Sequence, residues 1–247
     1  MARAHAHLPG SRRAVITGRF NIGLASCSVL LIGSSSGVSA QIAPSAAERA
    51  AYTGLFAAAA RGDADQIVAL IARGAKANER DGYGRTPLHV TAHAGHHAAM
   101  RALVVAGADP NALERDRYDI VTIAAVANDV QTLTVALALG ASAKNVTSRY
   151  DGTALIAAAH LGHAEVVRTL IAAGAPLDHI NNLGWTALIE SIVLGDGGAR
   201  HTDTLTALVE AGANVNLADR SGHTPLALAQ ARGYDAMVAV LRRAHAR

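Results

Sequence analysis

The sequence predicts an all-α solenoid of about six helix-turn-helix repeats. Similar stretches open at positions 53, 86, 121, 153, 186 and 224, so the successive steps are 33, 35, 32, 33 and 38. Most of these stretches are Ala-rich, and five of the units close on Gly-Ala. A repeat period of this size is the sequence mark of a helical repeat array. The fold class moves the question of function from an active site to a binding surface.

The first helix of each unit is expected to begin at a threonine. In residues 86–88 and 224–226 a Thr-Pro-Leu run opens the unit. A threonine hydroxyl at the N-cap accepts a backbone N–H, and proline in the first turn has no N–H to lose. Small side chains follow, as in residues 155–160, and let neighbouring helices approach closely. Three units then contain a glycine suited to ending a helix, namely Gly95, Gly162 and Gly233.

The second helix of each unit is expected from an apolar stretch such as residues 166–171. It ends at a Gly-Ala pair, which occurs at 74–75, 107–108, 140–141, 174–175 and 212–213. An extended Asp/Asn segment comes next, as in residues 109–111 and 214–216, and these residue types favour turns.

Together these residues resemble the ankyrin repeat, with its TPLH-type box, Gly-His turn, apolar helix and GADPN or GANVN end. The resemblance covers roughly residues 47–244. It implies an ankyrin-repeat solenoid, in which antiparallel helix pairs are joined by hairpin-like fingers. We expect a single domain over residues 41–247, with repeats at about 50–82, 83–115, 118–149, 150–182, 183–220 and 221–247.

Two units depart from this pattern. Residues 121–139 lack the proline, the histidine and the Gly-His turn, and the step to the next unit is only 32, so we expect a shortened helix junction there. The unit that opens at Thr186 is long, with a step of 38, and Gly195 to His201 is expected to be a flexible insertion between its two helices. Such an insertion is either a functional loop or a tolerated surface loop.

Residues 1–40 predict a secretory signal peptide, because basic residues are followed by an apolar run over 20–32 and a Val-Ser-Ala site before Gln41. We expect a periplasmic protein that has lost this segment. Residues 11–16 resemble a twin-arginine export motif, and residues 24–27 resemble a lipobox. Ordinary export, twin-arginine export, a lipoprotein and a retained anchor therefore stay open as alternatives.

Removal of residues 1–40 would change the charge and remove the single cysteine. The full chain carries 22 Lys+Arg and 19 Asp+Glu, a net charge of +3. Loss of four arginines leaves 18 − 19 = −1, which does not favour a nucleic acid or a membrane surface as the partner. Without Cys27 the mature chain has no disulfide, thiol nucleophile or cysteine metal site. We expect a monomer.

The resemblance implies that finger tips and the exposed ends of the first helices contact the partner. The corresponding finger positions are Tyr83, Arg85, Arg117, Tyr118, Arg149, Tyr150, Leu183, Trp185, Arg220, Ser221 and His223. On the first helices they are His93, Asn128, His160 and Arg232.

Tyr83, Tyr118 and Tyr150 are predicted to occupy equivalent finger positions, each with an arginine nearby. The next finger holds the only tryptophan, Trp185. Tyr, Trp and Arg are enriched at interface hot spots, so this row predicts a binding ridge. The alternative is that each tyrosine packs on the neighbouring finger and has a structural role.

Catalytic and cofactor motifs are not found. His89 and His93 lie four positions apart and could share a metal, but Val90 stands where a zinc-protease motif needs glutamate. The resemblance instead implies structural hydrogen bonds for His89 and His96. We expect no enzyme activity, metal or cofactor.

The predicted function is a non-enzymatic scaffold that binds another protein. The resemblance adds the expectation of a role in oxidative-stress protection linked to catalase. An immunity or inhibitor protein that blocks a toxin or hydrolase, and an effector secreted to a host cell, are the alternatives.

Overall fold

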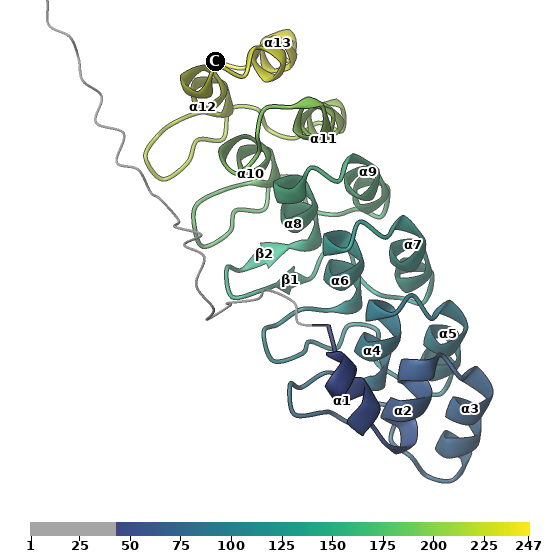
Figure 1. Ribbon diagram of the computed structural model, residues 1–247. Helices are drawn as coiled ribbons and strands as arrows, with labels where there is room; N and C mark the ends of the chain where they lie inside the picture. The colour runs from purple at the N-terminus through teal and green to yellow at the C-terminus, as the bar shows by residue number, and fades with distance from the viewer. Residues whose placement is uncertain (1–42) are drawn as a thin grey trace, which may run out of the picture. The chain divides into compact units, whose positions relative to one another are not determined.

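The computed structural model describes residues 43–247, in which a short helix, α1 (Ala46–Ala51), is followed by six helix pairs in two layers (Figure 1). The first helices of the pairs form the inner layer, beside the fingers: α2 (Gly54–Arg61), α4 (Pro87–His93), α6 (Ile120–Val126), α8 (Ala154–Leu161), α10 (Ala187–Val193) and α12 (Pro225–Arg232). The second helices form the outer layer: α3 (Ala64–Ala72), α5 (His97–Val105), α7 (Val130–Ala138), α9 (Ala164–Ala172), α11 (Ala199–Glu210) and α13 (Asp235–Arg243). The predicted solenoid of six repeats is confirmed. The expectations for residues 1–40 lie outside the described residues.

Side-chain oxygens begin most of the inner helices, as the sequence predicts. The hydroxyls of Thr153, Thr186 and Thr224 accept the N–H three residues on, each at 3.3 Å. In α4 the N-cap residue Thr86 is joined to His89, whose Nδ1 accepts the backbone N–H of Thr86 at 3.1 Å. Each hydroxyl satisfies a backbone N–H that has no partner inside the helix.

The third repeat starts at Asp119, not at Val121. The Asp119 carboxylate accepts the N–H of Thr122 at 2.8 Å and takes the place of the threonine hydroxyl. With Asp119 as the opening residue, the six openings stand at 53, 86, 119, 153, 186 and 224, and the steps become 33, 33, 34, 33 and 38. The expected shortening of this unit is therefore wrong. Asn128, at φ 55°, makes the turn that glycine makes elsewhere.

Histidine rings connect one repeat to the turn of the repeat before it. His96 Nε2 lies 3.2 Å from the carbonyl oxygen of Ala60, and His163 Nδ1 lies 3.0 Å from that of Ala125. Gly62, at φ 71°, ends α2 beside the His96 ring, and a Cβ at this position would lie 2.7 Å from that ring. Glycine is required here both by the left-handed backbone and by the close approach of the next repeat.

Alanine, leucine, valine and isoleucine fill the core along the whole array, as expected from a chain with 3% aromatic residues. Small residues such as Ala58, Ala125 and Ala158 are fully buried where inner helices pack on one another. Leu55, Leu88 and Leu155 occupy the same position in the inner helices α2, α4 and α8 and are at most 1% exposed. Burial therefore repeats from unit to unit, which is how stability is distributed in a solenoid.

The insertion after α10 is not the flexible loop that the sequence predicts. Its last residues, Ala199 to His201, form the first turn of α11, which has 12 residues where α9 has 9. The Gly195 carbonyl accepts the Tyr234 hydroxyl at 3.0 Å, and Asp196 Oδ1 accepts the Gly198 N–H at 2.9 Å. His201 is buried, and its Nε2 lies 3.0 Å from the carbonyl oxygen of His160. Added length is thus absorbed by a longer helix and a hydrogen-bonded turn.

The helix α1 packs beside the first repeat through charged and polar contacts. The capping box of Ser45 and Glu48 begins α1, and the Glu48 carboxylate also forms an ion pair with the Arg85 guanidinium. The Tyr52 hydroxyl donates to Asp81 at 2.8 Å. These contacts attach α1 to the first finger.

Candidate functional site

Five fingers connect the helix pairs, and each is made of the five residues that precede an inner-helix N-cap: residues 81–85, 114–118, 148–152, 181–185 and 219–223. In every finger the first side chain accepts the N–H of the third residue, at 2.8 to 3.2 Å. The chain around the third finger also pairs as two short strands, β1 (Val146–Thr147) and β2 (Gly152–Thr153), with Val146 opposite Thr153. This local bonding holds the finger tips in a fixed conformation.

The third residue of the fingers is Tyr83, Asp116, Tyr150, Leu183 and Ser221 in turn. Tyr118 does not belong to this row, which corrects the predicted ridge. It is the fifth residue of its finger, equivalent to Arg85, Trp185 and His223, and its side chain is buried at 6% exposure. The error has the same cause as the misplaced repeat start, because an aspartate, Asp119, stands at the N-cap where the pattern expects a threonine.

Arg85, which the sequence places on the contact surface, is buried in the structure. Its side chain is 2% exposed and forms ion pairs with Glu48 and, at 2.7 Å, with Asp81. Its guanidinium carbon lies 4.6 Å from the centre of the Tyr83 ring. Arg85 therefore supports the exposed Tyr83 from beneath and cannot contact a partner in this arrangement.

The remaining finger positions form an exposed edge of mixed apolar and basic character. Tyr83, Tyr150 and Leu183 are 42%, 46% and 40% exposed. The side chains of Arg117 and Arg149 are each 48% exposed and reach neighbouring fingers, where Arg117 pairs with Asp151 at 2.8 Å and Arg149 lies 3.7 Å from Asp116. Arg220, Ser221 and His223 are exposed as well, and Trp185 is half-buried. We call Tyr83, Arg117, Arg149, Tyr150, Leu183 and Arg220 the finger surface.

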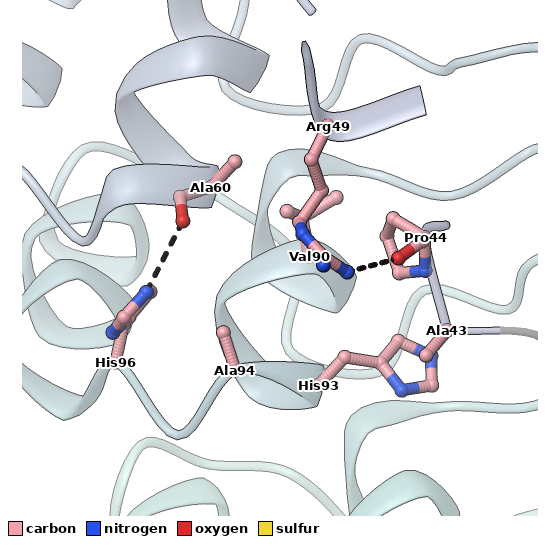
Figure 2. Close-up of a pocket in the computed structure, with 8 residues that line it drawn as sticks. All are labelled: Ala43, Pro44, Arg49, Ala60, Val90, His93, Ala94 and His96. Atoms are coloured by element: carbon pink, nitrogen blue, oxygen red, sulfur yellow. Dashed lines mark hydrogen bonds between the residues drawn. The ribbon is translucent and has the colours of Figure 1, made fainter. Parts of the chain in front are cut away.

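The predicted inner-helix residues lie in different environments. His93 is half-buried in a pocket of about 320 Å³, which Figure 2 shows beneath Arg49 and Pro44 of the segment that contains α1. Burial lowers the pKa of His93 to about 4, so the ring is neutral at pH 7. His160 is exposed over nearly half of its side chain, and Asn128 and Arg232 are exposed near the ends of their helices.

Both ring nitrogens of His89 are occupied by structural hydrogen bonds. Nδ1 accepts from Thr86, and Nε2 lies 3.2 Å from the carbonyl oxygen of Tyr118, to which it donates. Burial lowers the pKa of His89 to about 4. The ring is thus committed to holding two neighbouring repeats together rather than to a metal.

Glu190 is a buried carboxyl group that the sequence pattern alone does not single out. It lies on α10, is 4% exposed, and its Oε1 accepts the side-chain N–H of Asn181 at 2.9 Å. Burial raises its pKa to about 7, and the hydrogen bond from Asn181 opposes this rise. The signal that could have found it is a glutamate at a position where α4, α6 and α12 carry Val90, Ile123 and Leu228.

The comparison with known protein families agrees with this geometry. A family model for ankyrin repeats in three copies matches residues 28–114, 55–141 and 121–217, which together span well over half of the chain. The chain belongs to the ankyrin-repeat family. Ankyrin repeats are protein-protein interaction modules, and this family match indicates no catalytic family.

Similar ankyrin-repeat proteins occur in bacteria and in animals. YahD of Escherichia coli K12 is 33% identical over 185 residues, which cover 74% of this chain and 92% of YahD. The human ankyrin repeat and SOCS box protein 16 is 30% identical over 78% of this chain and 43% of its own length. A crystal structure of an ankyrin repeat domain from Acinetobacter baumannii AYE has a TM-score of 0.73 and 42% identity, and the match covers 78% of this chain and 98% of that domain.

Two properties of this ankyrin-repeat domain bear on other classes of site. Across residues 43–247, no helix is both long and apolar enough to cross a membrane. In the same part of the chain, no group of three or more His, Cys, Asp or Glu side chains is arranged to hold a metal ion.

Proposed function

We propose that this chain is an exported, non-enzymatic scaffold that captures another protein on its finger surface. One observation carries the proposal: Tyr83, Tyr150 and Leu183 share one finger position and keep 40% to 46% of their surface exposed. Exposed tyrosine and leucine side chains at the equivalent position of three fingers give a partner apolar surface to bury, and tyrosine is enriched at interface hot spots.

The fingers are suited to recognition because they are already ordered. The hydrogen bond inside each finger and the Arg117–Asp151 ion pair between fingers fix the tips before a partner arrives. A preformed surface loses little conformational entropy on binding. The exposed arginines add donors for carboxylates around the apolar positions.

The periplasm is the proposed location. The proposal is supported by the basic, apolar and small-residue segments of residues 1–40, which precede Gln41. Export through either the general or the twin-arginine route would deliver the mature chain there.

The biological role depends on the partner. A catalase or another peroxide-defence protein would place the scaffold in oxidative-stress protection. A toxin or hydrolase would make it an immunity or inhibitor protein, and a host protein would make it a secreted effector. Identification of the captured protein separates these roles.

The test is a capture experiment with the full-length chain, tagged at its C-terminus and expressed in a Gram-negative host. Proteins bound to it in the periplasmic fraction are quantified by mass spectrometry, and the captured chain is expected to begin at Gln41. The variant Tyr83→Ala/Tyr150→Ala/Leu183→Ala should bind its partner on the order of a hundredfold more weakly, since loss of each of the three central contacts removes about 1 kcal/mol or more.

The matched control is Val68→Ala/Val105→Ala, which removes apolar side chains that are 56% and 87% exposed on the outer helices α3 and α5. This variant should keep the partner. If the triple finger variant is folded by circular dichroism and still retains the partner fully, the finger surface is not the binding site.

A further inference from the structure

Glu190 occupies an apolar row of the inner layer. The fifth residue from the start of each repeat is Val90, Ile123, Ala157, Glu190 and Leu228 from the second repeat to the sixth. Val90, Ile123 and Leu228 are at most 9% exposed, and Glu190 is 4% exposed. A carboxyl group placed at a buried apolar position costs stability unless each oxygen finds a donor.

Only one of the two Glu190 oxygens has such a donor. Oε1 accepts from Asn181 Nδ2, and Asn181 is itself fixed because its Oδ1 accepts the N–H groups of Leu183 and Trp185. Oε2 is buried without a hydrogen-bond partner among the described residues. The imidazole of His160 is beside it, but its Nδ1 lies 3.7 Å away, which is too far for a hydrogen bond.

His160 lies beside this oxygen and can move. Nearly half of its side chain is exposed, and in residues 43–247 its ring makes no hydrogen bond. Burial, reinforced by His201, lowers the pKa of His160, so the ring is neutral at pH 7 and supplies no charge to Glu190. Rotation of the ring would open Oε2 to the surface of the inner layer.

The equivalent position three repeats earlier shows what this surface accommodates. Val90 and His93 of α4 correspond to Glu190 and Val193 of α10. Val90 and His93 line the pocket of Figure 2. The Arg49 side chain, from the segment that contains α1, enters that pocket and donates to the Pro44 carbonyl. A long cationic side chain thus already lies on this face of the array.

The number of free oxygens decides the kind of cation. An arginine guanidinium is best matched by both oxygens of a carboxylate, and at Glu190 it would have to share Oε1 with Asn181. A lysine ammonium is a compact donor that one oxygen can receive. Among the described residues no lysine or arginine forms an ion pair with Glu190, so its Oε2 can receive a cation from another molecule once the His160 ring turns aside.

We propose that Glu190 binds a lysine side chain of the partner protein, with His160 as the side chain that turns aside to admit it. The site lies on the inner layer beside the fingers and rests on the proposed function, because it gives the captured protein a second, charge-specific contact. The carboxylate form is needed, and the pKa of Glu190 at about 7 makes the site stronger above neutral pH.

The test is an NMR titration of the full chain with n-butylammonium chloride, which reproduces the end of a lysine side chain. The Glu190 carboxyl carbon and the His160 ring should shift saturably at pH 8, and the apparent affinity should fall about tenfold at pH 6, as the ionised fraction falls. Tetramethylammonium, which has no N–H, and guanidinium should shift them much less. An equal response to tetramethylammonium would overturn the site.

Variants separate the site from general charge effects. Glu190→Gln should abolish the saturable shift of the His160 ring, whereas Glu210→Gln, on the exposed face of α11, should keep it. His160→Ala should tighten butylammonium binding, because it uncovers Oε2. No shift in the wild type, or no change in Glu190→Gln, overturns the lysine site. If the lysine site fails but the finger surface still captures a protein, the scaffold function stands. If butylammonium binds but no protein is captured, only the scaffold function is overturned.

Discussion

Two buried titratable side chains of the inner layer respond to pH in opposite directions. His89 has its pKa lowered to about 4, so stability from its neutral ring is present above pH 6.5 and is lost as the pH falls towards 4. Glu190 has its pKa raised from 4.5 to about 7, so the folded state holds a proton that the unfolded chain has released. Stability linked to Glu190 therefore falls as the pH rises from about 4.5 to 7.

Replacement of the Glu190 carboxyl by an amide should remove this second dependence. Between pH 5 and pH 8 the wild type should lose roughly 2.5 kcal/mol of unfolding free energy relative to Glu190→Gln, because only the carboxyl group has to form a buried charge. Urea unfolding at both pH values, followed by circular dichroism, measures the difference. Glu210→Gln, at an exposed position, should follow the wild-type profile. If the unfolding free energies of Glu190→Gln and wild type differ by the same amount at both pH values, burial does not raise the pKa of Glu190.

At the scale of the element, α11 shows how a repeat keeps its contact with its neighbour. The ring of His201 lies against the carbonyl of His160, as His96 does at Ala60 and His163 at Ala125. The other ring nitrogen of His201, Nδ1, lies 2.8 Å from Asp196 Oδ1. The buried ring thus lies against an oxygen at each of its nitrogens, and this one side chain spans the junction from α10 to α11 and the preceding repeat.

Removal of that ring should loosen the fifth repeat. His201→Ala leaves the His160 carbonyl without its donor and empties a buried volume beside Gly162, so the unfolding free energy should fall by about 2 kcal/mol. The matched control is Asp203→Ala, an exposed residue of the same helix, which should change stability by less than about 0.5 kcal/mol. Chemical denaturation measures both. Equal stability of His201→Ala and wild type would contradict a supporting role for the ring.

The order of the helices was predictable from the sequence because capping threonines, turn glycines and the repeat period agree with one another. The third repeat was placed two positions late because Asp119 caps a helix as well as a threonine does, and only the hydrogen bond to Thr122 identifies it. Burial of Arg85 was not predictable, because it depends on Glu48 from α1, 37 positions away. Tyr83 and Tyr150 were found because exposed positions in the fingers recur with the repeat.

At the scale of the whole array of residues 43–247, stability is the sum of similar contacts between neighbours. Leu155 lies on α8, which packs between α6 and α10, and it is fully buried. Leu226 occupies the equivalent position on α12, which packs on the single inner helix α10, and it is half-buried. A leucine at this position therefore packs between two neighbouring inner helices in the middle of the array and against only one at α12.

The two leucines should differ in their contribution to folding. Leu155→Ala should lower the unfolding free energy by about 3 kcal/mol, because it leaves a cavity between three helices. Leu226→Ala should cost about 1 kcal/mol, because much of the removed surface already faces water. Urea titrations of the two variants beside wild type measure this. Equal losses would show that the core does not depend on neighbours at both sides.

The turn after α10 also shows how one repeat can be longer than the others and still make the same contact. His201 comes 15 positions after the threonine that opens its repeat, whereas His96 and His163 each come 10 positions after theirs. In space it meets the same kind of carbonyl group. A gain of residues in a repeat is accepted when the lengthened helix can return the same chemical group to the same place. The added residues lengthen the path from α10 to His201, and the contact at the end of that path is kept.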